Sequence, residues 1–252
     1  MQMTGNTLLI VGGTSGIGRA LAGAFHALGN QVIIAGRRQS LLDEICAIHP
    51  GMRGYRLDVQ DSAAIDTFAR RLRRDHPELN VLINNAGISR QENLLADPPE
   101  LAVTRSIIDT NILSVLDMTT ALLPLLQQQA NATIITTTSG LAFVPRANFP
   151  TYCASKAFLH SWLQSLRVQL RPTGIEVLEL APPYVQTELS GPQQVLDPHA
   201  MPLAAYIDEV MRLLTERQTP GSEVLVERVK GERWAERDGN YAQRFSLFND
   251  AQ

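Results

Sequence analysis

The segment Thr7-Leu-Leu-Ile-Val11 runs directly into Gly12-Gly-Thr-Ser-Gly-Ile-Gly18, and this junction decides the fold. The first part is apolar, which predicts a buried strand, and apolar residues at helical spacing begin at Ile17. The glycines allow a tight turn, close approach of the backbone to a pyrophosphate, and close helix packing. The N–H groups at the start of the helix would then face the phosphates. A plain structural turn is the alternative. The candidate contacts are Gly12, Thr14, Ser15, Gly16, Ile17 and Gly18.

Strand and helix patterns alternate along the rest of the chain. The expected strands are Thr7–Val11, Gln31–Ala35, Met52–Leu57, Val81–Asn84, Ala132–Thr138, Ile175–Leu180 and Glu223–Val229. The expected helices are Ile17–Leu28, Ser40–His49, Ser62–Asp75, Glu100–Gln129, Tyr152–Arg171 and Leu203–Arg217. Nearly continuous apolar strands separated by helices predict an α/β fold, with a seven-stranded parallel sheet covered by helices on both faces. We expect this three-layer Rossmann fold to form a single domain over residues 1–252.

The composition excludes several classes of protein. With 44% hydrophobic and 19% charged residues, the chain is an ordinary globular protein rather than a disordered or fibrous one. The net charge of −3, without a long block of like charge, disfavours nucleic acid and anionic membranes as partners. We expect no signal peptide and no membrane span, and therefore a cytoplasmic protein. The two cysteines and five scattered histidines form no ligand pattern, so we expect neither a disulfide nor a metal site.

The end of the second strand predicts which dinucleotide binds. About 20 residues after the glycine turn, an acidic residue would bond the ribose 2′-hydroxyl of NAD. This chain instead has Gly36-Arg37-Arg38. Two guanidiniums, with Ser15 nearby, suit the additional phosphate of NADP(H), which we expect to be preferred over NAD(H). The alternative is that Arg37 and Arg38 only begin a solvated helix.

A second group of residues indicates acid–base chemistry. Tyr152 and Lys156 are four residues apart at the start of a predicted helix and therefore share one face. Only two of the 22 basic residues are lysines, at 156 and 230, so a lysine at this position is unusual. An ammonium beside a phenol is expected to lower the phenol pKa toward neutral pH, which would make Tyr152 a general acid or base. Ser139 follows the fifth strand and could point into the same cleft, and Asn111 is an isolated amide within a predicted helix. A chance pairing of Tyr152 and Lys156 is the alternative.

With these residues in order, the chain resembles the short-chain dehydrogenase/reductase superfamily from Asn6 to Val229. The similarity rests on the glycine turn, Asp58-Val59, Asn84-Asn85-Ala86-Gly87, Asn111, Ser139 and Tyr152-xxx-Lys156. It implies that Tyr152 exchanges a proton with the substrate oxygen, which Ser139 orients. It also implies that Lys156 binds the nicotinamide ribose and that Asn111 holds a water of the proton relay. The further cofactor contacts that it implies are Asp58, Val59, Asn85, Ala86, Gly87, Pro182, Val185 and Thr187.

Two segments depart from the usual pattern of that superfamily. After the sixth strand the chain reads Pro182-Pro183-Tyr184-Val185 rather than Pro-Gly, and residues 230–252 form a polar tail with four aromatic residues. These features, with Ser139–Pro145, resemble the DltE-like branch. The segment Thr187–Pro202 holds Gly191 and three prolines and follows the carboxyl end of a strand. It predicts a mobile substrate lid, with an ordinary surface loop as the alternative.

The sequence therefore favours an NADP(H)-dependent oxidoreductase that acts on a small carbonyl or alcohol substrate. We expect apolar pocket walls from Leu141, Phe143, Phe149, Tyr184 and Leu189, whereas Arg90 and Arg146 would be rim charges or, less favoured, contacts to a carboxylate. A dinucleotide-sensing protein without turnover, or non-redox chemistry on the same fold, are the alternatives. Apolar residues on more than one face of the helices 100–129 and 152–171 predict a homodimer or homotetramer. We expect His160, one turn after Lys156, to be a packed or surface residue.

Overall fold

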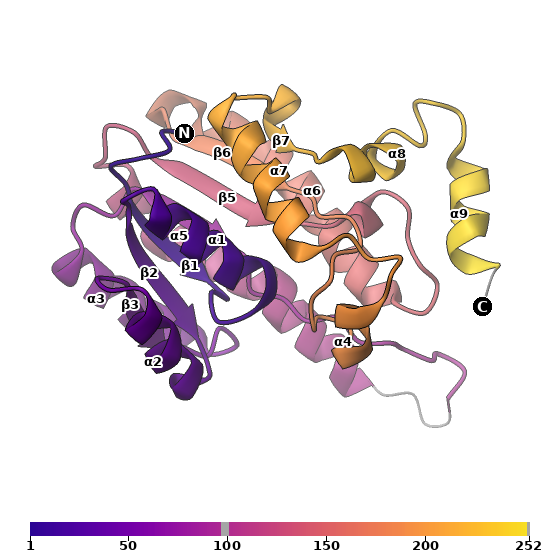
Figure 1. The fold of residues 1–252 in the computed structure, drawn as a ribbon, viewed down its shortest axis with the longest axis horizontal. Coiled ribbons are helices and arrows are strands. Elements are labelled where there is room, and N and C mark those ends of the chain that lie inside the picture. The colour runs from indigo at the N-terminus through magenta and orange to yellow at the C-terminus, as the bar shows by residue number, and fades with distance from the viewer. Residues whose placement is uncertain (97–100, 251–252) are drawn as a thin grey trace.

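The computed structural model describes residues 1–96 and 101–250, and a parallel sheet of seven strands runs through them (Figure 1). The strand order β3-β2-β1-β4-β5-β6-β7 confirms the predicted fold class. The order reverses between β1 and β4, which is where ligands bind in open parallel sheets. The strands are β1 Thr7–Val11, β2 Gln31–Gly36, β3 Arg53–Arg56, β4 Val81–Asn84, β5 Thr133–Thr137, β6 Glu176–Leu180 and β7 Glu223–Val224.

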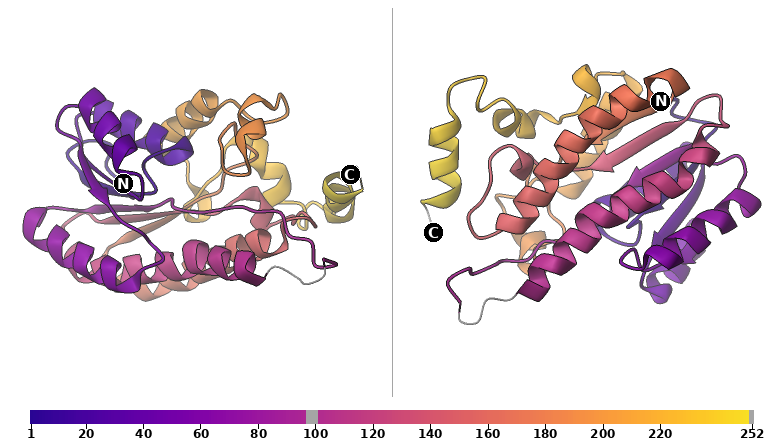
Figure 2. Two further views of the ribbon diagram at one scale, coloured as in Figure 1. Left: turned by 90° about the horizontal axis from the view of Figure 1, so that it is seen from below. Right: turned by 180° about the vertical axis from the view of Figure 1, so that it is seen from behind.

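Helices cover both faces of the sheet (Figure 2). One face carries α1 Gly16–Ala27, α2 Gln39–Ile48 and α7 Leu203–Thr215, and the other carries α3 Ser62–Asp75, α4 Leu101–Ile108, α5 Ser114–Leu126 and α6 Pro150–Leu170. Successive side chains of a strand point to opposite faces, so β1 contributes to both cores. Leu8 and Ile10 enter the cluster beneath α1, and Leu9 and Val11 enter the cluster beneath α5.

The helix expected over Glu100–Gln129 is interrupted in the structure. Glu100 lies outside the described residues. From Leu101 the chain forms α4, then a π-helical turn over Asp109–Leu113, and then α5. The Ser114 hydroxyl donates to the Thr110 carbonyl over 2.6 Å within this turn. The turn shifts the phase of the helix, so that α4 packs on α6 whereas α5 packs on β4, β5 and α3.

The run Leu101–Leu126 is long and apolar enough to cross a membrane by length and composition alone, which the sequence analysis overlooked. In the structure 44% of its most apolar window is buried. Core helices of soluble proteins meet the same criterion, so this run is weak evidence for a membrane span.

The seventh strand ends earlier than predicted. The expected strand Glu223–Val229 is therefore wrong beyond Val224. Its neighbour β6 is followed by Pro182 and Pro183, which have no backbone N–H and cannot continue the hydrogen bonds between the two strands. The chain instead forms a 3₁₀ turn and two helices that the sequence analysis missed, α8 Lys230–Arg233 and α9 Tyr241–Asn249. α9 lies at the edge of the molecule, away from the sheet (Figures 1 and 2).

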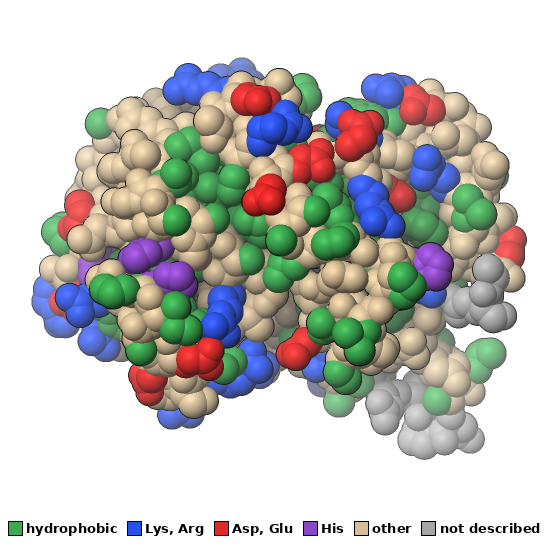
Figure 3. Space-filling view, in the orientation of Figure 1, with side chains coloured by type: hydrophobic (Ala, Val, Ile, Leu, Met, Phe, Trp, Pro, Cys, Tyr) green, Lys and Arg blue, Asp and Glu red, His purple; other side chains and the backbone are tan. Residues whose placement is uncertain are grey.

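On one face of the molecule, side chains of opposite charge are interspersed rather than grouped by sign. On the face shown in Figure 3, basic and acidic side chains are interspersed, with hydrophobic side chains between them. This distribution agrees with the small net charge of −3. It offers no broad field of one sign on the face in view to attract a polyanion.

Candidate active site

A cavity of about 450 Å³ opens at the carboxyl ends of the strands, where the sequence analysis expected ligands. It is lined by almost all of the predicted site residues. These are Gly12, Thr14, Ser15, Gly16, Ile17, Arg37, Arg38, Asp58, Val59, Asn85, Ala86, Gly87, Ser139, Tyr152, Lys156, Pro182, Val185 and Thr187. Residues from segments that are far apart in the sequence therefore share one cavity. Two predicted residues, Gly18 and Asn111, are not part of its lining.

The glycine turn is shaped by close backbone contacts. Gly12 has φ +81°, and a Cβ there would lie 2.7 Å from backbone atoms of Ala86. A Cβ on Gly18 would lie 2.2 Å from the Gly12 carbonyl oxygen. Gly18 therefore lets α1 pack against the turn instead of contacting a ligand. The turn leaves an open cradle in front of the first residues of α1, as a pyrophosphate requires.

The second strand ends in a basic pair beside this cradle. Arg37 and Arg38 are both exposed, and Arg38 Nη2 donates to Ser15 Oγ over 3.2 Å, which confirms the expected proximity of Ser15. A Cβ on Gly36 would lie 2.7 Å from Thr14 Cγ2. An acidic side chain at position 36 would therefore require the Thr14 side chain to shift.

The opposite end of the cavity is buried. Ser139 follows β5 and begins a 3₁₀ turn, and its Oγ accepts a hydrogen bond from Leu141 N over 3.1 Å. Tyr152 and Lys156 project from the first turns of α6, and their exposed fractions are only 5% and 4%. Lys156 Nζ donates to the Thr137 carbonyl over 2.8 Å and lies 5.8 Å from the centre of the Tyr152 ring.

Burial controls the protonation of this pair. It raises the pKa of Tyr152 to about 12, although a hydrogen bond with Ser139 acts in the opposite direction. It lowers the pKa of Lys156 to about 8. The expectation that the ammonium lowers the phenol pKa is therefore wrong for the chain alone, because desolvation of the phenolate outweighs the other effects. At neutral pH the phenol keeps its proton and can donate it.

Asn111 lies on the π-helical turn and is fully buried. Its Oδ1 accepts from Ile88 N over 2.9 Å, and its Nδ2 donates to the Ile88 carbonyl and to Ser155 Oγ, both over 3.0 Å. The amide thus joins the loop after β4 to α6. Because these bonds occupy both amide hydrogens, the Oδ1 atom is the only part of the side chain with capacity for a water.

The structure adds cavity residues that the sequence analysis did not name. Gln60 reaches across to Thr110 Oγ1 over 2.7 Å, and Gln194 is buried and donates to the Val185 carbonyl over 2.7 Å. Ile88 and Glu188 also line the cavity. Glu188 and Gln194 belong to the segment predicted as a lid, whereas Gln60 and Ile88 belong to no predicted site segment and reach the cavity through the tertiary fold.

Of the five residues predicted as apolar pocket walls, only Leu189 lines the cavity, and Arg90, expected as a rim charge or carboxylate contact, lines it as well. Phe143 instead packs edge-on to the His160 ring, with the centroids 5.0 Å apart, and lies under the Arg233 guanidinium. The cavity lining also lacks four other residues that were expected near the substrate, namely Leu141, Arg146, Phe149 and Tyr184.

Comparison with known proteins identifies the family. Residues 6–195 match the family model described as short chain dehydrogenase. The chain belongs to the short-chain dehydrogenase family. It is 38% identical, over 99% of its length and 98% of the relative, to the uncharacterized oxidoreductase DltE of Bacillus subtilis. It is also 34% identical to sulfoacetaldehyde reductase 2 of Chromohalobacter salexigens, over 73% of this chain and 74% of that protein.

A solved structure of the family has the same architecture. The short-chain dehydrogenase from Sphingobium yanoikuyae in complex with NADPH superimposes with a TM-score of 0.79 at 25% identity, covering 98% of this chain and 97% of that chain. Family members are oxidoreductases that use a nicotinamide cofactor. The residues present here fit such a group, because the glycine cradle, the basic pair and the buried end of the cavity form one continuous space.

Proposed function

We propose that this protein is an NADP(H)-dependent oxidoreductase that interconverts a carbonyl group and an alcohol, with Tyr152 as the general acid or base. The observation that carries the proposal is the burial of Ser139, Tyr152 and Lys156 at one end of a cavity whose other end is a phosphate cradle. A protein that only senses a dinucleotide has no use for this buried trio.

Each residue of the trio has a distinct role in the proposed reaction. Tyr152 donates its proton to the carbonyl oxygen, and its raised pKa keeps the phenol protonated at neutral pH. The Ser139 hydroxyl, fixed by Leu141 N, orients that oxygen. Lys156, held by the Thr137 carbonyl, supports the ribose and the phenol. When bound, the nicotinamide supplies the hydride. Asn111 braces the loop at Ile88 and holds a water of the relay at Oδ1.

The basic pair supports a preference for NADP(H). Two exposed guanidiniums, one already beside Ser15, suit the 2′-phosphate. Gly36 cannot carry the carboxylate that would favour NAD(H) without a contact at Thr14. The NADPH complex of the Sphingobium yanoikuyae relative agrees with this choice.

The substrate end of the cavity suits a small carbonyl compound. Ile88, Val185 and Leu189 are apolar, whereas Arg90 and Glu188 add one charge of each sign. The segment Thr187–Pro202 would act as the lid, since Thr187, Glu188, Leu189 and Gln194 all line the cavity.

NADPH absorbance, followed with a panel of carbonyl compounds, tests the proposed function. The panel includes an aliphatic aldehyde, an aromatic aldehyde, a β-keto ester and sulfoacetaldehyde, which the name of one relative suggests. We expect oxidation of NADPH with at least one compound and none with the Tyr152→Phe variant. Tight NADPH binding without turnover across the panel would favour the sensing protein instead.

We also infer that the protein is cytoplasmic and assembles as a dimer or tetramer. Apolar side chains remain exposed on the helices expected at the interface, with exposed fractions of 47% for Leu113, 42% for Phe158 and 59% for Val168. Exposed apolar residues on neighbouring helices favour association. Light scattering should therefore give at least twice the chain mass of 27.7 kDa, and cell fractionation should recover the protein in the soluble fraction.

A further inference from the structure

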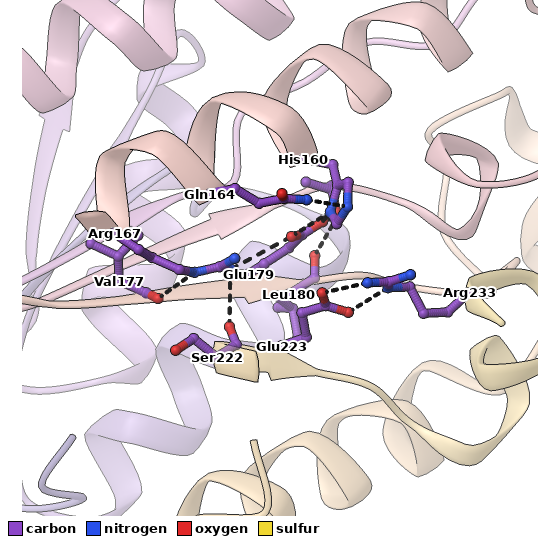
Figure 4. Close-up of polar contacts among 10 residues, drawn as sticks. His160, Gln164, Arg167, Val177, Glu179, Leu180, Ser222, Glu223 and Arg233 are labelled. Atoms are coloured by element: carbon purple, nitrogen blue, oxygen red, sulfur yellow. Dashed lines mark hydrogen bonds and ion pairs between the residues drawn. The ribbon is translucent and has the colours of Figure 1, made fainter. Parts of the chain in front are cut away.

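A cluster of charged and polar side chains, with two buried carboxylates, joins residues of β6, β7 and α6 (Figure 4). We call it the Glu179 cluster. The proposed reaction does not use these residues directly, and the sequence analysis singled out only His160, as a packed or surface residue. The members are Thr138, His160, Arg167, Glu179, Glu223 and Arg233.

Two carboxylates lie side by side in this cluster. Glu179 on β6 pairs in register with Glu223 on β7, and their exposed fractions are 0% and 6%. Like charges in such positions repel each other and need cations. Arg233 binds both oxygens of Glu223, over 2.6 and 2.9 Å, and Arg167 Nη2 lies 3.6 Å from Glu179.

Glu179 makes further contacts that Glu223 lacks. Thr138 Oγ1 donates to Glu179 Oε1 over 2.8 Å, and His160 Nδ1 lies 3.0 and 2.8 Å from the two carboxylate oxygens. Gln164 lies 2.8 Å from the other ring nitrogen of His160. Glu179 therefore connects to two segments that carry the trio.

Two of the residues bonded to Glu179 lie close in sequence to members of the trio. Thr138 directly precedes Ser139, and His160 lies one helical turn after Lys156 on α6. A single buried carboxylate thus holds the end of β5 against α6. The chemistry of the trio depends on the placement of its atoms, for which an error of about 1 Å can cost on the order of 10²-fold in rate.

A metal ion is a poorer explanation of the cluster. Ligand atoms of His160, Glu179 and Glu223 lie within 4.8 Å of one another. However, all four carboxylate oxygens already have nitrogen or hydroxyl partners, and two guanidiniums already balance the two negative charges. A divalent cation would have to displace these arginines or lie beside them.

We propose that Glu179 is a positioning residue for the oxidoreductase reaction proposed above. Through Thr138 it places Ser139, and through His160 it places the turn of α6 that carries Tyr152 and Lys156. It touches neither the cavity nor the substrate, since it is fully buried behind the trio.

Glu223 provides a matched control within the same cluster. It is similarly buried and paired with an arginine, but among the described residues its carboxylate bonds to Arg233 and not to Thr138 or His160. Glu179→Gln and Glu223→Gln each remove one charge from the cluster and keep the side-chain shape. Both variants should lower the unfolding temperature, because each leaves an arginine without its carboxylate.

The two variants should differ in catalysis. We expect Glu179→Gln to lower kcat about tenfold and to leave the KM for NADPH within about twofold, because the trio is displaced and the cofactor cradle is not. Glu223→Gln should keep kcat near that of the wild type. Equal losses of kcat in both variants, or an unchanged kcat in a folded Glu179→Gln, would overturn the proposal.

A second pair of variants tests the proposal if the Glu179→Gln protein does not fold. Thr138→Val removes the hydroxyl that bonds Glu179 and keeps the shape, whereas Thr138→Ser keeps the hydroxyl. Thr138→Val should lose kcat, and Thr138→Ser should lose distinctly less. Equal effects would show that the hydrogen bond does not position Ser139.

Hydrogen exchange separates this proposal from the proposed function, since it needs no substrate. Glu179→Gln should speed amide exchange in residues 138–143 and 150–160, and Glu223→Gln should not do so in residues 150–160. That pattern would support positioning even if no carbonyl compound were turned over, and its absence would overturn it. A metal would be tested by the unfolding temperature with zinc chloride. If zinc chloride raised it in the wild type but not in His160→Gln, the cluster would be a metal site and the proposal would be wrong.

Discussion

The two ends of the cavity use cations in opposite ways. At the nucleotide end, Arg37 and Arg38 are exposed at the rim, whereas at the chemical end Lys156 is 4% exposed and its pKa falls to about 8. An exposed guanidinium attracts a phosphate through water and can be changed at moderate cost. A buried ammonium is held in one position, and its protonation depends on the groups around it. Under the proposed function, the same charge would serve cofactor recognition at one end and the reaction at the other.

The largest effect is expected at the buried end. Tyr152→Phe removes the proton donor and leaves the glycine cradle untouched, so turnover should fall by roughly 10²–10⁴-fold. NADPH affinity, measured by fluorescence titration, should stay close to that of the wild type. Near-normal turnover in this variant would show that another group donates the proton.

Lys156→Arg tests whether position matters more than charge. The planar guanidinium cannot occupy the place of the ammonium between the Thr137 carbonyl and the Tyr152 ring, so turnover should fall on the order of 10²-fold. The control is Lys230→Arg at the chain's other lysine, which is ion-paired with Glu227 on the surface. If Lys156→Arg were as active as Lys230→Arg, the exact position of the buried ammonium would not matter for the reaction.

A smaller effect is expected at the exposed end. Replacing Arg37 and Arg38 by serine should reduce the preference for NADPH over NADH by roughly 10–100-fold, if charge-assisted bonding by this exposed pair contributes about 1.5–3 kcal/mol in total. The KM for NADH serves as the internal control and should change little. Unaltered NADPH affinity in the double variant would mean that the pair only begins α2.

The smallest effect comes from pH, and its sign follows from burial. Because the pKa of Lys156 is about 8, its ammonium loses its proton above that pH, and kcat/KM for carbonyl reduction should be about tenfold lower at one pH unit above the pKa. Tyr152, with a pKa of about 12, stays protonated over this range. The residual activity of Lys156→Arg should be flat across the same range. A constant wild-type kcat/KM to about one unit above pH 8 would contradict the assignment.

The sequence predicted the parallel sheet and most of the cavity because both depend on local patterns. The glycine turn at Gly12, the basic pair at Arg37 and the spacing of Tyr152 and Lys156 are visible in the residues themselves. The strand predicted to Val229 failed because Pro182 and Pro183 end its partner, which is a tertiary effect. The phenol pKa was expected in the wrong direction because residue spacing carries no information on burial.

Contacts across the fold explain the remaining differences. Phe143 was expected to face the substrate, but it packs against His160 and Arg233, which come from distant segments, and it does not line the cavity. Gln60 reaches the cavity through a loop whose course no local pattern determines. Most of the motif residues predicted from sequence therefore line the cavity, with Gly18 and Asn111 as exceptions, whereas the positions of residues placed by packing were not predicted.

The π-helical turn at Asp109–Leu113 has a consequence for the length of this chain. A π turn is one residue added to an α-helix, and each residue of an α-helix turns it by about 100°. Deletion of a single residue there would rotate α4 against α5 and take Asn111 away from Ile88 and Ser155. Surface loops tolerate insertions and deletions, so homologous chains of different length should differ in their loops and keep the residue count of this helix constant.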